Sequence, residues 1–398
     1  MKTLIIGGGA VGSIMARSLA RDRSSQVVVG TNDVKKAVKF MSGKYPRIKI
    51  KKLDAFKREE IKRACVGMDL VANASLPTFN LPIMEAALAA RSNYQDLCSE
   101  IKDLRHPEQL RLNKKFKEKG LNALINTGVS PGITNMVVCD AVDKLDAGEK
   151  KVKIRLLEEQ KANELIFAWS PVVTLDEVTS PPLVFHSGKF GLTRPFANIE
   201  EYEFPAPYGK RNTASIYGDE ISTLPLYLEI SDIDYKSTGT DIDFAKALYR
   251  LGLFDKKPRK LGGRKIVPQD FFASIAPPVP TPAKMMELMK NGTIENAILI
   301  MIVEVEGKQQ KKPIKIKTTI TLPDLKEIAR RFPGATYISY PTGIAAAAFA
   351  RIVPKIKKHG VYPTETLNSY LRKEIMVDLE GTGIVIDQEF SGAAVRTR

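Results

Sequence analysis

Cysteine and histidine are scarce in this chain of 398 residues. The three cysteines, Cys65, Cys98 and Cys139, form no C-x-x-C pair and no spacing typical of a metal site. The three histidines lie far apart in the sequence, which argues against a histidine-based zinc site. A small and odd number of cysteines also fits a reducing compartment. We therefore predict that the protein holds no metal.

Long apolar runs are also absent, since no stretch reaches the length of a membrane span. The first strand of the expected fold begins at about residue 3, which leaves no room for a signal peptide. Hydrophobic residues make up 43% of the chain, which is typical of a globular protein, and the length allows two or three domains. We expect a cytoplasmic protein without a membrane partner.

Acidic residues are fewer than basic ones, with 45 Asp and Glu against 61 Lys and Arg and a net charge of +16. Such an excess is one signal of nucleic-acid binding. Here the basic residues are spread along the chain, with clusters such as 49–52 and 308–317, and no basic motif is interleaved with aromatic residues. We favour a solvated surface that attracts an anionic cofactor and substrate, and we predict no nucleic-acid partner.

The first twelve residues combine an apolar run with closely spaced glycines. Residues 4–6 are typical of a strand buried on both faces, and residues 13–21 have helical periodicity. The glycines between them have the spacing G-x-G-x-x-G, which allows a tight turn, a close approach of pyrophosphate and close packing of the helix. The helix start offers free N–H groups to phosphates. We predict a dinucleotide site at Gly7, Gly9, Ala10, Val11 and Gly12.

The end of the second expected strand, 26–30, bears on the choice between NAD and NADP. An acidic residue there holds the ribose hydroxyls of NAD, but the position after this strand is Thr31. Asn32 and Asp33 follow, and then Lys35 and Lys36, which are close enough to meet a 2′-phosphate. Both cofactors stay open, with a lean to NADP. Asp33 is a candidate for the ribose and equally for a helix N-cap.

Further strands at 48–53, 69–74, 92–96 and 121–125 alternate with helices at 57–65, 81–90 and 133–144, which predicts a parallel sheet. Ligands bind at the carboxyl ends of such strands. Asn73, Ala74 and Ser75 are therefore expected near the nicotinamide, and Asp96 lies at the same edge.

Past Asp146 the pattern changes to alternating apolar and polar residues at 151–157, 298–306 and 312–321. This alternation predicts a mixed or antiparallel sheet with one solvated face. A small-residue helix at 342–352 is expected to return to the first sheet. The fold class is therefore α/β. A discontinuous Rossmann-type domain takes residues 1–145 and 335–390, and an α+β domain for substrate binding and dimerisation takes residues 146–334.

Several motifs together resemble the saccharopine dehydrogenase family, which includes glutamate-forming saccharopine reductases and lysine 6-dehydrogenases. They span nearly the whole chain: the glycine motif, Asn73–Ala74, the stretch 128–135 that is similar to G-x-x-P-G-x-x-N, and the segments 234–237, 248–254, 341–343 and 360–363. The resemblance implies a nicotinamide cofactor, hydride transfer at a carbon that bears nitrogen, an amino-acid substrate in the middle domain, and a homodimer. Thr31 departs from the members that prefer NAD.

The resemblance also implies that residues 209–213 face the substrate, where Asn212 replaces the family's Asp. Arg211 is our first choice for the substrate carboxylate, since arginine binds carboxylates with two hydrogen bonds. Asp96 is our candidate for the ammonium partner or proton acceptor. Its alternative role is a cap after the strand.

Other candidates for substrate contact lie in or near the family motifs. Cys98 is one, with a small buried hydrophobe as its alternative role. The helix start at the Pro-Gly turn is another, for which a purely structural turn is the alternative. Trp169, Tyr94 and Tyr217 are candidates either for the cleft or for packing. The predicted substrate-binding set is Cys98, Gly128, Pro131, Gly132, Asn135 and Arg211.

The sequence thus predicts an NAD- or NADP-dependent oxidoreductase that acts on an amino acid or an amino-acid-derived secondary amine. A lysine 6-dehydrogenase is the alternative within the enzymes, and a non-catalytic sensor of NAD(P) is the alternative of another class. Titratable groups in the cleft favour an enzyme. Saccharopine has three carboxylates and lysine has one, so the number of cationic groups in the cleft discriminates between them. Arg194, Lys210 and Arg211 are the candidates to meet three carboxylates.

Overall fold

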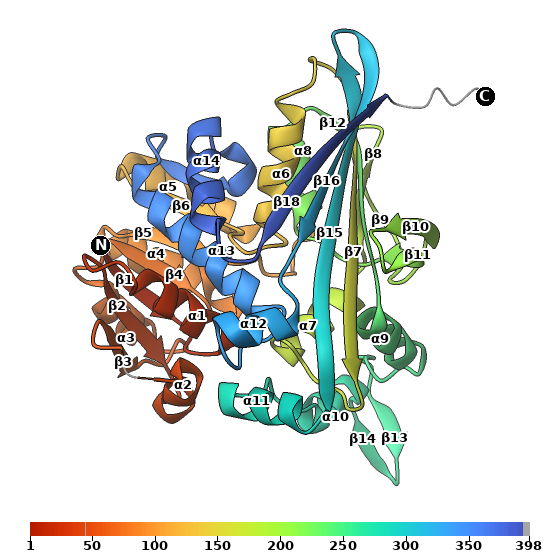
Figure 1. Ribbon diagram of the computed structural model, residues 1–398. Coiled ribbons are helices and arrows are strands. Elements are labelled where there is room, and N and C mark those ends of the chain that lie inside the picture. Colours follow the sequence, from red (N-terminus) through yellow and green to blue (C-terminus); the bar gives the residue numbers. More distant parts are fainter. Residues whose placement is uncertain (44, 393–398) are drawn as a thin grey trace.

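A computed structural model describes residues 1–43 and 45–392 of the chain. Two sheets lie side by side, each with its own helices, and Figure 1 shows the N-terminal sheet in red and orange beside the long strands of the second. In the described residues, no helix combines the length and the apolar character needed to cross a bilayer. The predicted combination of a parallel sheet with a second, mixed sheet is confirmed.

The first sheet has seven parallel strands in the order β17-β6-β5-β4-β1-β2-β3. Its strands are β1 (Lys2–Ile6), β2 (Gln26–Thr31), β3 (Ile48–Lys52), β4 (Leu70–Asn73), β5 (Asn93–Asp96), β6 (Asn122–Ile125) and β17 (Gly360–Pro363). Because the chain order reverses beside β1, the carboxyl ends of β1 and β4 flank the crevice where such sheets bind ligands.

Helices cover both faces of this sheet, as the alternation in the sequence predicts. They are α1 (Ala10–Leu19), α2 (Val34–Met41), α3 (Arg58–Cys65), α4 (Asn80–Ala90), α5 (Asn113–Glu118), α6 (Ile133–Val142), α13 (Ser339–Ile352) and α14 (Ser369–Leu379). The late helix α13 packs on α1, where a Cβ added to Gly343 would lie 2.7 Å from the Cβ of Ile14. The glycine therefore permits the close contact that brings the C-terminal segment back to the first sheet.

The second sheet is mixed and has nine strands, seven of them in the order β10-β11-β12-β7-β15-β16-β18, with β8 and β9 attached through β12. Its strands are β7 (Lys150–Ala162), β8 (Leu183–His186), β9 (Lys189–Leu192), β10 (Glu200–Phe204), β11 (Gly209–Ser215), β12 (Ile230–Thr238), β15 (Ile294–Gln309), β16 (Lys312–Thr321) and β18 (Val385–Gly392). β12 runs parallel to β7, and the other pairs are antiparallel.

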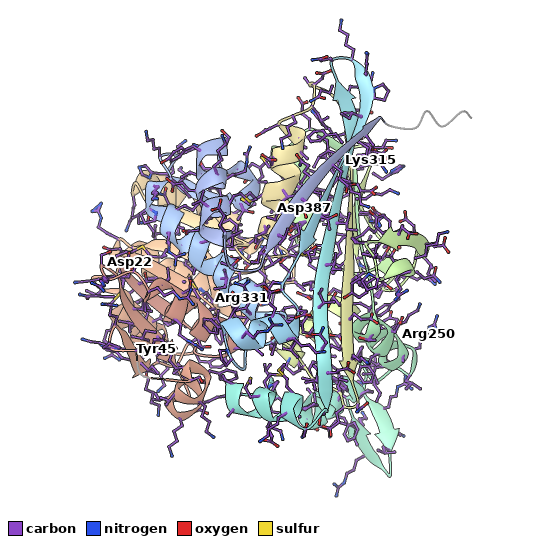
Figure 2. The ribbon with its side chains drawn as sticks, in the orientation of Figure 1. Asp22, Tyr45, Arg250, Lys315, Arg331 and Asp387 are labelled. Carbon is purple, nitrogen blue, oxygen red and sulfur yellow. The ribbon has the colours of Figure 1, made fainter. Side chains whose placement is uncertain are left out.

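The remaining elements surround the second sheet: α7 (Pro171–Thr179), α8 (Glu220–Tyr227), α9 (Thr240–Arg250), the small hairpin of β13 (Arg259–Leu261) and β14 (Arg264–Ile266), α10 (Pro268–Ile275), α11 (Pro282–Lys290) and α12 (Leu325–Arg331). Figure 2 shows Arg331 on α12 and Arg250 on α9, on the two sides of the long strands. The sequence analysis missed α7, α8, α10, α12 and the short strands between residues 183 and 215, because these elements are short and lie among proline-rich loops.

The C-terminal segment belongs to both sheets. α13, β17 and α14 lie with the first sheet. Residues 385–392, however, form β18 and pair with β16 in the second sheet, with Ile320 opposite Ile386. The return segment thus ends by crossing to the second sheet. Apolar and polar residues alternate at 385–390 (VIDQEF), which suits an edge strand with one exposed face.

Candidate active site

A cavity of about 620 Å³ lies between the carboxyl edge of the first sheet and one face of the second. The glycine turn, the ends of β2 and β4 and the turn before α6 line it from the first sheet. From the second sheet come residues of β7, β12 and β15, and α7 and the start of α8 complete the lining. The cavity therefore lies where the sequence predicts the cofactor, and it extends to the second sheet.

The glycine turn fits a dinucleotide. Gly7 has φ +116°, and a Cβ added to it would lie 2.4 Å from the carbonyl oxygen of Ala74. A Cβ on Gly12 would lie 2.0 Å from the oxygen of Gly7, so the helix packs directly on the turn. A Cβ on Gly9 would meet no described atom within 4 Å, so its backbone is open to the cavity. Ala10 and Val11 line the cavity at the start of α1, so pyrophosphate can reach free N–H groups there.

The end of β2 forms the adenosine side of this cavity. Thr31, Asn32, Asp33 and Lys36 line it. The Asp33 carboxylate accepts a hydrogen bond of 2.9 Å from the backbone N–H of Lys36 and caps α2, which was its alternative role. Lys36 is the only basic residue among the described residues that line the cavity.

The loop after β4 is shaped by Asn73. Its side-chain oxygen accepts hydrogen bonds from the backbone N–H and hydroxyl of Ser75, at 3.0 and 2.8 Å, and its amide donates to Asn80 at 2.8 Å. Ala74 and Ser75 line the cavity, whereas Asn73 lies behind them and is buried. The predicted trio is therefore assembled, with two contact residues and one that holds the loop.

Backbone N–H groups of the Pro-Gly turn before α6 form hydrogen bonds to acceptors in or next to the turn itself. The backbone N–H of Gly132 donates to the side chain of Asn135 at 3.1 Å, and that of Ile133 donates to the oxygen of Gly128 at 3.2 Å. Gly128 and Pro131 line the cavity, while Gly132 and Asn135 do not. The geometry favours the structural role of this turn over capture of a carboxylate.

Asp96 lies behind the cavity wall and is 1% exposed. It accepts hydrogen bonds from the backbone N–H of Asn126 at 2.9 Å and from the side chain of Gln109 at 3.0 Å. Burial raises the pKa of Asp96 to about 8. Cys98, two residues further on, does line the cavity, and burial together with the charge of Asp219 raises the pKa of its thiol. The structure does not bring Asp96 into the cavity.

Arg211 is not brought to the cavity either. It lies on β11, which β12 separates from β7 and which pairs with β10 on its other side, and its guanidinium donates to the backbone oxygen of Lys210 at 3.2 Å. Lys210 pairs with Glu201 at 2.8 Å, and Arg194 does not line the cavity. The three cations expected to meet the carboxylates of saccharopine are thus absent from this lining.

Carboxylates that the sequence analysis missed line the cavity instead. Asp219 and Glu220, which we call the proximal pair, contact the first sheet's side of the cavity. Asp219 accepts hydrogen bonds from the backbone N–H of Ser99 at 3.1 Å and from the hydroxyl of Tyr217 at 2.9 Å. Burial, with the neighbouring charge of Glu220, raises the pKa of Asp219 to about 7.

Glu220 has one oxygen with partners and one without. Its Oε1 accepts hydrogen bonds from the hydroxyls of Thr134, at 2.6 Å, and Ser130. Its Oε2 is buried and has no hydrogen-bond partner among the described residues. Burial raises the pKa of Glu220.

Glu158 and Glu177, which we call the distal pair, line the cavity from β7 and α7. Glu158 accepts a hydrogen bond of 2.9 Å from the hydroxyl of Ser237 on β12, and burial raises its pKa to about 7. Burial and the charges of Asp219, Glu158 and Glu220 raise the pKa of Glu177. Within the described part of the chain, no group of acidic, histidine or cysteine side chains is arranged to hold a metal ion.

Sequence signals for these residues are weak but real. Glu158 follows the apolar residues Leu156 and Leu157 on a strand expected to be partly buried, and adjacent acids occur at 219–220 next to Tyr217 and Gly218. Of the aromatic candidates, Trp169 and Tyr217 line the cavity, and Tyr94 is fully buried in the core.

Comparison with known proteins adds the family to this geometry. Residues 3–124 match the family model described as the saccharopine dehydrogenase NADP binding domain, and residues 128–384 match the saccharopine dehydrogenase C-terminal domain. A structure of apo saccharopine dehydrogenase (L-Glu forming) from Saccharomyces cerevisiae has the same fold, with a TM-score of 0.69 and 14% identity over 98% of this chain and 100% of that chain.

Two relatives are similar to this chain over much of their length. Carboxyaminopropylagmatine dehydrogenase from Synechocystis sp. is 24% identical over 92% of this chain and 93% of its own length. Carboxynorspermidine synthase from Vibrio cholerae is 22% identical over 67% of this chain and 70% of its own length. With both family domains matched over nearly all of its residues, the chain belongs to the saccharopine dehydrogenase family and is an NAD(P)-dependent oxidoreductase of that family.

Proposed function

We propose that this enzyme transfers a hydride at a C–N bond that joins a polyamine-type amine to an amino-acid-derived group. The lining of the cavity carries this proposal: four carboxylates face the substrate side, and the one basic residue of the described lining, Lys36, lies at the adenosine side. Such a lining attracts ammonium groups and repels carboxylates. The names of the two relatives contain agmatine and norspermidine, and both of these compounds are bases of this kind.

Asp219 is suited to exchange the proton that this chemistry requires. In the reductive direction an amine and an aldehyde condense to an imine with loss of water, and the imine nitrogen must gain a proton as a hydride reaches its carbon. NAD(P)H supplies that hydride when bound. The pKa of Asp219, about 7, allows it to donate the proton near neutrality, while Ser99 and Tyr217 fix its orientation. In the oxidative direction a C–H bond breaks, a C=N bond forms, and Asp219 accepts the N–H proton.

We infer that NADP(H) is preferred over NAD(H). Thr31 carries no charge to repel a 2′-phosphate, and the Lys36 side chain lines the same end of the cavity. A phosphate there gains a charged partner without meeting a carboxylate directly after β2.

The alternatives fit this lining less well. Saccharopine carries three carboxylates and lysine one, and no basic residue of the described lining lies near the four carboxylates to hold them. Titratable groups at the cavity also favour an enzyme over a sensor, because a sensor of NAD(P) needs no buried acid beside the cofactor.

The test is consumption of NADPH, followed by its absorbance, with purified protein. Diamines and agmatine are offered with an amino-acid aldehyde such as aspartate β-semialdehyde, and NADH is compared with NADPH. In parallel, saccharopine and lysine are offered with NADP⁺ and NAD⁺. We expect turnover that needs both the cationic amine and the aldehyde, and that is faster with NADPH.

Turnover of saccharopine or lysine instead would overturn the proposed substrate class. Tight binding of NADPH without turnover of any member of the panel would favour the sensor.

A further inference from the structure

The cavity carboxylates divide by position into two pairs. The proximal pair is held by groups from the first sheet's side: Ser99, which follows β5, bonds Asp219, while Ser130 and Thr134, around the start of α6, bond Glu220. The distal pair belongs to the second sheet and its helix, since Glu158 lies on β7 against Ser237 of β12 and Glu177 lies on α7. The groups that hold the proximal pair follow β5 or surround the start of α6, at the carboxyl edge where the nicotinamide is expected.

None of the four carboxylates forms an ion pair with a basic residue among the described residues, and their neutral partners do not satisfy every oxygen. Glu220 Oε2 is buried without a partner, although the residue lines the cavity. Glu177 is subject to repulsion from Asp219, Glu158 and Glu220 together. Buried acids without partners are costly, so a ligand that brings positive charge would relieve both pairs.

Apolar side chains accompany the acids on the substrate side. Leu156, Val173, Ile216 and Leu299 line the cavity, and the indole of Trp169 lines it too. Methylene groups pack against such side chains, and an aromatic face attracts an alkylammonium. A lining that combines acids with apolar side chains therefore matches a chain of ammonium groups spaced by methylenes.

We propose that the distal pair, Glu158 and Glu177, binds a second ammonium group of the same substrate whose reacting nitrogen lies at the proximal pair. The substrate amine then carries at least two positive nitrogens joined by a methylene chain. This inference rests on the proposed function for the reacting nitrogen, but binding of a dication by the distal pair can be measured without turnover.

Trp169 provides the measurement, because it is the only tryptophan of the chain and lines the cavity. Its emission is followed with NADP⁺ present and aldehyde omitted, while putrescine, spermidine or butylamine is added. A second charged contact contributes enough to make the diamine bind about tenfold to a hundredfold more tightly than the monoamine of equal length. Equal affinity of putrescine and butylamine would overturn the proposal.

Neutral variants of the distal pair test whether Glu158 and Glu177 cause the tighter binding of the diamine. Glu158→Gln and Glu177→Gln should each weaken putrescine about tenfold and leave butylamine unchanged. Glu159→Gln and Asp176→Asn are matched controls, since each changes the neighbouring residue on the same element and neither lines the cavity. The controls should keep the affinity for putrescine. Loss of affinity for both amines in the distal variants would contradict a separate second subsite.

The two proposals fail in different ways. If NADPH turnover is absent but putrescine binds through Glu158 and Glu177, the dication subsite stands and the proposed reaction is wrong. If turnover occurs and the distal variants leave the KM for diamines unchanged, the reaction stands and the second subsite is wrong.

Discussion

Two groups of carboxylates lie on opposite faces of the second sheet, and they differ in whether they have cationic partners and in the direction of their pKa shifts. On the face away from the cavity, Glu200 and Asp234 flank the guanidinium of Arg155 at 2.6 and 3.0 Å, and Lys236 lies 2.8 Å from Glu200. We call these four residues the paired cluster. Burial alone would raise the pKa of Glu200, but its bond to Lys236 and the charge of Arg155 lower it to about 2. On the cavity face, the pKa values of the carboxylates are raised.

Strand alternation produces this difference. Arg155 and Glu158 lie on β7, and Lys236 and Ser237 lie on β12, but successive side chains of a strand point to opposite faces. Arg155 of β7 and Lys236 of β12 belong to the paired cluster, whereas Glu158, on the other face of β7, accepts a hydrogen bond from a hydroxyl and pairs with no cation among the described residues. The paired cluster serves the fold, whereas the unpaired cavity carboxylates weaken the fold and leave charge available for a ligand.

The largest expected effect comes from neutralising Asp219, the acid that we propose exchanges the proton. Asp219→Asn keeps the shape of the side chain, but its one oxygen can accept from only one of Ser99 and Tyr217, which donate to different oxygens of Asp219, and the amide cannot donate a proton as the acid does. We expect kcat to fall by about 10²- to 10⁴-fold. In the reductive direction the wild-type rate should decline as the pH rises through about 7, and the variant should lose this decline.

The measurement is the steady-state kcat from about pH 5.5 to about pH 9, a range that brackets the pKa of Asp219. Binding of NADP⁺ serves as the control for folding. A variant with an unchanged pH profile and kcat would remove Asp219 from the reaction.

A second substitution pair compares the two faces directly. Glu200→Gln removes one partner of Arg155, which is fully buried, and should lower the free energy of unfolding by about 2 kcal/mol. Glu158→Gln removes repulsion on the other face and should leave that free energy unchanged or raise it by about 1 kcal/mol. Urea unfolding of the two variants measures both signs. If the two substitutions destabilise the protein equally, the contrast between the faces is wrong.

The fold was predictable because its signals are local. The glycine motif, the apolar strand before it and the alternation of strands with helices predict the first sheet, and alternation along 151–157, 298–306 and 312–321 predicts long strands of the second. The structure extends these strands to Lys150–Ala162 and Ile294–Gln309. Crossing of the C-terminal strand to the second sheet has no local signal, since pairing of β18 with β16 joins residues about seventy apart.

The residues that line the first sheet's side of the cavity were predictable for the same reason, whereas the carboxylates on its other side were not. Glu158, Glu177 and the proximal pair come from β7, α7 and the start of α8, and only tertiary packing brings them together. Arg211 was selected from a resemblance over a short segment, but it lies on β11, which β12 separates from β7 and which does not reach the cavity. Asp96 does lie at the correct sheet edge, but its side chain points to Gln109 and Asn126 rather than to the cavity.

The smallest expected effect is on the pH dependence of stability. The pKa values of Glu158 and Asp219 are raised to about 7, above their unfolded values near 4. The folded state therefore binds protons that the unfolded state releases, and each of the two groups should raise stability by about 1 kcal/mol as the pH falls from about 8 to 6. Glu200 has a lowered pKa, so its contribution is lost only as the pH falls through about 2.

A polyamine separates the cavity carboxylates from other buried acids that titrate in the same range. Asp96 and Glu365 have raised pKa values of about 8 and 7 but do not line the cavity. A ligand in the cavity should therefore leave their contribution to the pH dependence of stability unchanged. Saturating spermidine should keep Glu158 and Asp219 charged, and thus reduce the rise in melting temperature on acidification. Glu158→Gln should reduce that rise without spermidine. A rise in melting temperature that neither change reduces would mean that its source lies outside the cavity, and that the unpaired carboxylates are not held ready for a cation.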